Sequence, residues 1–98
     1  MYFTYIMRCE DNSLYTGIST DVERRFREHK DRVGAKYTAS RAVKEICAVW
    51  SSKNRSDASR LEYYIKTLEK GKKEALIKGQ YVIGDLLPVD YELYERIK

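Results

Sequence analysis

The chain has little of the chemistry that cross-links small proteins or binds zinc. Its 98 residues include only two cysteines, Cys9 and Cys47, and one histidine, His29. Two cysteines are too few for a disulfide framework, and their spacing from the histidine matches no zinc-binding pattern. We therefore expect both cysteines to be buried thiols in a reducing compartment.

Long apolar runs are also absent. No stretch approaches the roughly 20 residues that a membrane-spanning helix needs, and the N-terminus lacks a charged region followed by an apolar one. No internal repeat or low-complexity stretch is visible. These absences favour a soluble, cytoplasmic protein.

Positive charge is concentrated in the middle of the chain. The net charge is +4, yet residues 24–55 alone hold ten basic and three acidic residues, a local net charge of +7. Such an excess is typical of a polyanion-binding surface, although a solvated helix face and loop would explain it equally well. The length allows one domain, which we assign to residues 1–84, followed by a slightly acidic tail over residues 85–98.

Three segments predict strands. Residues 2–9 and 14–18 are rich in β-branched and aromatic residues and are separated by turn formers, which indicates a hairpin. The apolar run over residues 45–51 indicates a third strand that is buried on both faces.

Three further segments predict helices, over residues 21–33, 57–70 and 72–78. Thr20 and Glu23 fit a capping box at the start of the first helix. Gly71 and Gly79 are placed to end the second and third helices. The order β-β-α-β-α-α indicates an α/β (α+β) fold with a small sheet covered by helices.

The first predicted helix carries two candidate functional residues, Arg25 and His29, one turn apart at the edge of its apolar stripe. An arginine in this position can hold a phosphate bidentately, or it can pair with Glu28 or Asp21. Arg24 points away from the stripe and is expected to be solvated. His29 taken alone is more typical of a partly buried, hydrogen-bonded histidine than of a catalyst.

Tyr5 and Tyr15 lie on the two strands of the hairpin, so their hydroxyls can approach each other. A tyrosine has an ordinary pKa of about 10 and needs a nearby cation, such as Arg25 or a metal ion, to favour its phenolate. The alternative is that both are amphipathic residues at the edge of the core. Gly17 either permits a close approach of backbone or substrate, or forms a bulge.

Glu62 is the one carboxylate that borders the core stripe near the middle of the second predicted helix. A single carboxylate that faces a basic site is a common way to hold Mg²⁺, with water and substrate phosphate completing the coordination. Two structural alternatives are an ion pair with Lys66 and a capping box that starts at Ser59.

Together these residues resemble the GIY-YIG nuclease domain family, in its small single-domain branch. The two signature tripeptides correspond to residues 3–5 (FTY) and 15–17 (YTG), and they are followed by Arg25, His29 and a glutamate on a later helix. The stretches LYTGISTDVERRFREHK and GAKYTASR are similar to the same branch, and the resemblance extends over nearly the whole chain.

This resemblance implies a three-stranded, mainly antiparallel sheet flanked by helices, and a divalent-metal-dependent cut of a DNA phosphodiester. It implies that Glu62 binds Mg²⁺ or Mn²⁺ and that Arg25 clamps the phosphate. Tyr5 and Tyr15 would position or deprotonate the attacking water, and His29 would assist proton transfer. Four basic residues are expected to contact the DNA backbone: Arg27, Lys30, Lys36 and Arg41.

The sequence thus leads to the hypothesis of a DNA endonuclease that acts in repair or processing on branched or single-stranded DNA with weak sequence preference. We expect a monomer or weak dimer, with a partner protein as a further source of specificity. The main alternative is a nucleic-acid-binding module with weak or no catalysis on the same fold. A protein-interaction domain that uses the apolar segment after residue 80 is a third reading.

Overall fold

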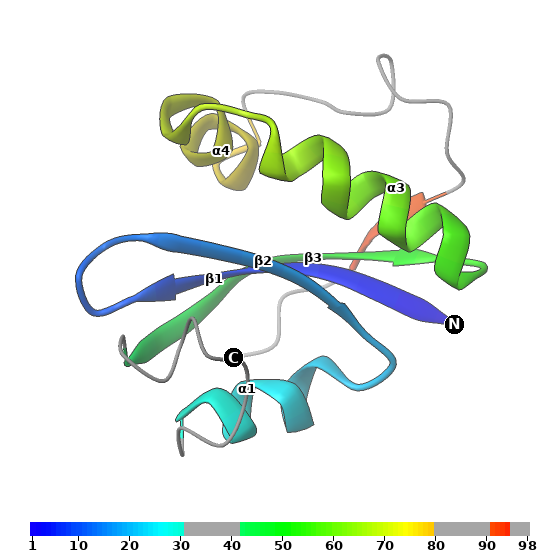
Figure 1. Cartoon of the computed structure of the whole chain (residues 1–98), viewed down its shortest axis with the longest axis horizontal. Coiled ribbons are helices and arrows are strands. Elements are labelled where there is room, and N and C mark those ends of the chain that lie inside the picture. The colour runs from blue at the N-terminus through cyan, green and yellow to red at the C-terminus, as the bar shows by residue number, and fades with distance from the viewer. Residues whose placement is uncertain (31–41, 80–90, 95–98) are drawn as a thin grey trace.

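Four antiparallel strands form the centre of the molecule (Figure 1). They are β1 (Tyr2–Cys9), β2 (Leu14–Ser19), β3 (Val43–Ser52) and β4 (Tyr91–Tyr94), and they pair in the order β2-β1-β3-β4. The structure, a computed structural model of the whole chain, describes residues 1–30, 42–79 and 91–94.

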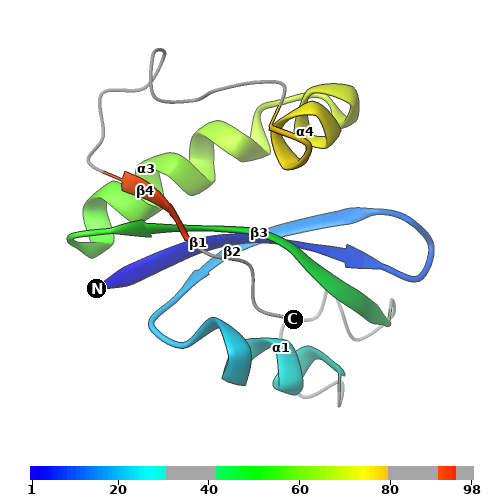
Figure 2. The same ribbon diagram turned by 180° about the vertical axis from the view of Figure 1, so that it is seen from behind.

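Helices cover both faces of this sheet. α1 (Val22–Lys30) lies on one face, whereas α3 (Arg55–Lys66) and α4 (Lys70–Ile77) lie on the other, as the two opposite views show (Figures 1 and 2). The buried apolar residues form one cluster on each face. The cluster under α3 and α4 includes Ile6, Trp50, Leu61 and Ile65, and the cluster under α1 includes Tyr5, Met7, Val22 and Val49.

The alternation of side chains along β1 explains the two clusters. Tyr5 belongs to the α1 side, while Thr4 and Ile6 lie on the α3 side, as the twofold period of a strand requires. The hydroxyl of Thr4 donates a hydrogen bond of 3.0 Å to the backbone carbonyl of Ala58, which fixes α3 to the central strand.

The predicted fold class is confirmed. The three predicted strands form an antiparallel sheet, which is flanked in the described residues by α1, α3 and α4. β3 is buried on both faces over most of its length, as its apolar run indicated. β4, which pairs with β3 from Val49↔Tyr94 to Ser52↔Tyr91, is a strand that the sequence analysis did not predict within residues 85–98.

The start of α1 differs in detail from the prediction. The side chain of Asp21 accepts a hydrogen bond of 3.0 Å from the backbone amide of Arg24, so Asp21 caps the helix instead of Thr20. The predicted last turn of this helix, residues 31–33, lies outside the described residues.

α3 also begins and ends earlier than predicted. Asn54 caps it by accepting a hydrogen bond of 2.9 Å from the amide of Asp57, which excludes a capping box at Ser59. Its last helical residue is Lys66, and Gly71 lies in the first turn of α4. Gly79, with a φ of 78°, follows α4 as predicted.

The described residues include both cysteines, and they also bear on whether a helix could span a membrane. Cys9 and Cys47 are both buried and form no disulfide. No helix within residues 1–30 and 42–79 is long and apolar enough to span a membrane.

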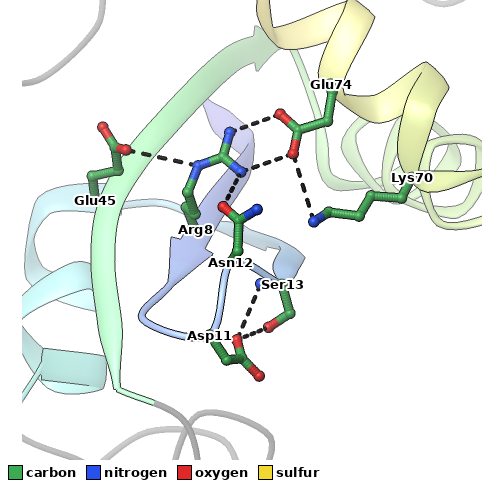
Figure 3. A network of polar contacts seen from close by, with 7 residues as sticks. All are labelled: Arg8, Asp11, Asn12, Ser13, Glu45, Lys70 and Glu74. Carbon is green, nitrogen blue, oxygen red and sulfur yellow. Dashed lines mark hydrogen bonds and ion pairs between the residues drawn. The ribbon is translucent and has the colours of Figure 1, made fainter.

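A polar network at the hairpin end of the sheet holds α4 in place (Figure 3). The guanidinium group of Arg8 donates two hydrogen bonds, of 2.8 and 2.7 Å, to the carboxylate of Glu74 on α4. It also donates to Asn12 in the hairpin turn at 3.0 Å and lies 3.7 Å from Glu45 on β3. Arg8 therefore connects two strands, a turn and a helix.

The Glu74→Gln variant is expected to be less stable than the wild type at pH 7 by about 1–3 kcal/mol, because a neutral amide is a weaker partner for the poorly exposed Arg8. The hydrogen bonds from Arg8 hold the pKa of Glu74 below its ordinary value of 4.5. A carboxyl whose pKa is lowered by folding contributes stability above its unfolded-state pKa and loses it as the pH falls through its folded-state pKa.

The difference in unfolding free energy between wild type and Glu74→Gln should consequently shrink between pH 7 and pH 3, as measured by urea unfolding. Glu69→Gln is the matched control, since the side chain of Glu69 is exposed at the start of α4 and makes no capping hydrogen bond. An unchanged difference at both pH values would contradict this account.

Candidate active site

Tyr5 and Gly17 are directly paired in the candidate site. They face each other across β1 and β2, whose register is continuous from Phe3 to Arg8. A Cβ atom at Gly17 would lie 2.6 Å from the hydroxyl oxygen of Tyr5 and 2.8 Å from its Cζ atom. The pairing of β1 and β2 is regular at Gly17, so no bulge forms there, and the group that lies close to the glycine backbone is the Tyr5 side chain.

Tyr5, Tyr15 and His29 form a continuous row of rings on the α1 side of the sheet. The ring centroids of Tyr5 and Tyr15 are 6.2 Å apart, and those of Tyr15 and His29 are 5.2 Å apart in an edge-on arrangement. Tyr5 and His29 are buried, whereas Tyr15 is half-buried. The partly accessible Tyr15 ring therefore lies between two buried rings.

Arg25 borders this row from α1. Its guanidinium group lies 3.0 Å from the carboxylate of Glu28, the ion pair considered in the sequence analysis, and it also interacts with the hydroxyl of Tyr5. The side chain of Arg25 is 43% exposed, so part of its fork faces solvent. The Arg25 side chain therefore contacts the buried Tyr5 hydroxyl and is also partly exposed to solvent.

The phenol of Tyr5 is kept in its neutral form. Burial raises its pKa well above the ordinary value, the adjacent Tyr15 adds to this increase, and Arg25 offsets only part of it. We expected a cation near Tyr5 to favour the phenolate, but loss of hydration outweighs the effect of Arg25. At neutral pH Tyr5 is thus a hydrogen-bond donor and not a base.

His29 is neutral for a related reason. Burial lowers its pKa below 6.5, and the positive charge of Arg25 lowers it further, while Glu28 acts in the opposite direction. A neutral imidazole retains a lone pair and can accept a proton. The His29 side chain is fully buried, more so than its position at the edge of the helix stripe indicated.

Glu62 lies on α3, which covers the opposite face of the sheet (Figure 1). Its side chain is 23% exposed and its carboxylate lies 3.2 Å from the ammonium group of Lys66, the predicted i,i+4 pair. No ion pair joins Glu62 to Arg25 among the residues that the structure describes.

Arg25 nevertheless lines a hollow together with a residue of the helix that carries Glu62. This hollow, at the edge of β2, is lined by both Arg25 and Arg55, the first residue of α3. Glu62 follows Arg55 by seven residues, which is within about 20° of two full helical turns. Arg55 and Glu62 consequently project from the same side of α3, about 10 Å apart along its axis.

The donor set around Glu62 restricts the kind of metal ion that would fit. Within residues 1–30 and 42–79, no three histidine, cysteine or acidic side chains converge as a metal cage. A single, partly exposed carboxylate fits a hydrated Mg²⁺ ion, which keeps most of its water and takes further oxygen ligands from a phosphate.

The four residues expected to contact DNA occupy different settings. Arg27 is exposed and pairs with Glu23 at 3.1 Å, and the ammonium group of Lys30 lies 6.0 Å above the ring centre of Phe26. Lys36 and Arg41 lie outside the described residues.

Comparison with known proteins identifies the family of the chain. Residues 1–75 match the model of the GIY-YIG catalytic domain. This chain belongs to the GIY-YIG family.

Its relatives include small proteins of similar length. The chain is 49% identical over 81 residues to a UPF0213 protein of Cronobacter sakazakii, covering 81% of this chain and 83% of that one. It is 42% identical over 76 residues to the UPF0213 protein BH0048 of Halalkalibacterium halodurans, covering 78% and 81%. The solution NMR structure of UPF0213 protein BH0048 from Bacillus halodurans has 40% sequence identity and a TM-score of 0.52, over 82% of this chain and 86% of that one.

Sequence reasoning missed Tyr2, Arg24 and Arg55, which line the hollow beside Arg25. Arg24 was expected to be solvated, and it is exposed. Arg55 was counted in the basic segment without a role. The spacing of seven residues between Arg55 and Glu62 was the available signal, since it places both on one side of a helix.

Proposed function

We propose that this member of the GIY-YIG family is a DNA endonuclease that hydrolyses phosphodiester bonds with the help of a divalent metal ion. The observation that carries the proposal is the grouping of Tyr5, Tyr15, Arg25 and His29 on one side of the sheet, around Gly17. The membership of the chain in a family defined by a catalytic domain supports the same conclusion.

Arg25 is proposed to bind the phosphate that is cut. Its planar fork can donate two parallel hydrogen bonds to phosphate oxygens, and its permanent charge stabilises the negative charge that grows on them in the transition state. The partial exposure of Arg25 supports this role, and the neutral Tyr5 hydroxyl beside it can orient the guanidinium group.

Tyr15 and His29 are proposed to handle the attacking water. The water oxygen attacks phosphorus in line with the leaving oxygen, and the bond from phosphorus to that oxygen breaks. Tyr15, which is accessible from solvent, would orient the water by hydrogen bonding. The neutral imidazole of His29, whose ring lies against that of Tyr15, would take up the water proton, and the leaving oxygen would take a proton from solvent.

Glu62 is the residue that would hold the metal ion, for which we propose Mg²⁺ or Mn²⁺. When bound, such an ion neutralises charge on the phosphate oxygens and lowers the pKa of water. The ion pair with Lys66 keeps the Glu62 carboxylate oriented along the helix flank, where it shares a side with Arg55.

The small surface of the protein favours recognition of DNA shape over DNA sequence. Basic side chains near the site, including Arg27 and Lys30, would contact phosphates, which carry no sequence information. Branched or single-stranded DNA in repair or processing is the proposed substrate class. A monomer or weak dimer would act on it, with a partner protein supplying additional specificity.

A cleavage assay tests this function directly. Purified protein is incubated with fluorescent flap, junction and single-stranded DNA in the presence of Mg²⁺, of Mn²⁺, or of EDTA. We expect internal cuts that depend on metal and disappear with EDTA. Salt-sensitive binding without cleavage under either metal would instead identify a nucleic-acid-binding module, and no binding at low salt would exclude both functions.

A further inference from the structure

A polar hollow of about 350 Å³ opens where β2 ends and where α1 and α3 begin. Among residues 1–30 and 42–79 its lining consists of Tyr2, Ile18, Ser19, Thr20, Arg24, Arg25, Glu28 and Arg55. These residues come from β1, from the edge strand β2 and the turn after it, and from helices on both faces of the sheet. The hollow therefore lies between the start of α1, which carries Arg25, and the start of α3, which carries Arg55.

The charge of this lining is unbalanced. The described lining residues include three arginines and one glutamate, which together carry a net charge of +2. Glu28, the one acidic residue, is paired with Arg25 at 3.0 Å. Arg24 and Arg55 are exposed, and within the described part of the chain neither side chain makes an ion pair. Two guanidinium groups thus remain available to an anion from solvent.

The other lining groups suit a nucleotide better than a simple ion. The half-buried Tyr2 offers an aromatic surface beside the arginines, and Ile18 adds an apolar patch. Basic and aromatic side chains that alternate along a groove are the usual composition of single-strand binding sites, because phosphates contact the former and bases or sugars pack on the latter.

We propose that Arg55 and Arg24 bind the DNA phosphate next to the one held by Arg25, so that the strand crosses the edge of β2 from α1 to α3. The inference rests on the proposed function, since it takes Arg25 as the residue at the cut phosphate. It assigns a backbone-binding role to two residues outside the tyrosine, histidine and glutamate group. The strand path also brings the cut phosphate toward the side of α3 from which Glu62 projects.

Salt-dependent binding tests this assignment without cleavage. Affinity for a labelled single-stranded oligonucleotide is measured in EDTA across a tenfold range of salt for wild type, Arg55→Gln, and Arg24→Gln. Each lost phosphate contact should lower the slope of log affinity against log salt by about 0.7. When the salt concentration rises tenfold, the factor by which affinity falls should therefore be about five times smaller for each variant than for wild type.

Arg60→Gln is the matched control. Arg60 is an exposed arginine on the same helix, but it lines a different hollow with Tyr63 and Tyr64. Its replacement should leave the slope unchanged, and circular dichroism should show the same thermal midpoint for all variants. Equal slopes for Arg55→Gln, Arg24→Gln and wild type would overturn the inference.

The result of this binding test can be distinguished from the result of the cleavage assay that tests the proposed function. If wild type cuts DNA but neither Arg55→Gln nor Arg24→Gln changes the slope, the endonuclease assignment stands and the strand path is wrong. If wild type binds without cutting and both variants lower the slope, the basic hollow is a DNA contact on a binding module. Absence of binding by wild type at low salt overturns the inference.

Discussion

Glu62→Gln is expected to reduce metal-dependent DNA cleavage by about 10³-fold or more while leaving the protein folded. Glutamine keeps the size of the side chain but removes the negative charge that a divalent ion requires. The only ion pair of Glu62 among the described residues is with Lys66, whose side chain is 54% exposed. Its loss should cost no more than about 0.5 kcal/mol of stability.

Metal binding gives this prediction a readout that does not depend on turnover. Titration with Mn²⁺, followed by electron paramagnetic resonance, should show one bound ion for wild type in the presence of a DNA strand and a marked loss of affinity for Glu62→Gln. Reduced activity with unchanged Mn²⁺ binding would place the metal ion elsewhere.

Glu23→Gln is the control for Glu62→Gln, because Glu23 forms the same kind of i,i+4 ion pair, with Arg27, on an exposed helix face. This variant should cut DNA at the wild-type rate. If Glu62→Gln and Glu23→Gln both behave like wild type, the assignment of the metal to Glu62 is wrong.

Gly17→Ala is expected to destabilise the protein and to impair the site at the same time. The new methyl group would lie 2.6 Å from the hydroxyl oxygen of Tyr5, and the 1% exposed Tyr5 side chain has no solvent-filled space into which to move. Overpacking of this kind costs about 1–3 kcal/mol. For a domain of this size the thermal midpoint should fall by about 10 °C.

A displaced Tyr5 would also lose its contact with Arg25, so cleavage by Gly17→Ala should fall even at a temperature where the variant is fully folded. Gly71→Ala is the matched control, because a Cβ atom at Gly71 meets nothing within 4 Å. Since alanine favours helix, this variant should have an unchanged or slightly higher thermal midpoint. Equal midpoints for the two variants would refute the packing explanation.

The local elements were well predicted because local patterns determine them. The strand over residues 2–9 and the hairpin that follows it depend on β-branched and aromatic residues and on a turn, all within one short stretch. The side of the first helix on which Arg25 lies depends only on the 3.6-residue period. In the structure Arg25 is half-buried, as expected for a residue at the edge of the apolar stripe.

The errors concern features that several elements determine together. Thr20 and Asp21 are both good capping residues, and the turn that leaves β2 decides which of them reaches the amide of Arg24. β4 is only four residues long and is stabilised by pairing with a strand about forty residues earlier in the chain, so its own sequence gives little signal.

The sequence by itself determined the α+β plan, the family resemblance and the candidate residues Tyr5, Tyr15, Arg25, His29 and Glu62. Only the tertiary structure decided how these residues are protonated and which of them share a surface. Burial against both hairpin and helix keeps Tyr5 and His29 neutral, and burial depends on contacts between distant segments. The same packing brings Arg55 and Arg25 to one hollow at the edge of β2. The sequence does not indicate this, because the two residues are 30 positions apart in the chain.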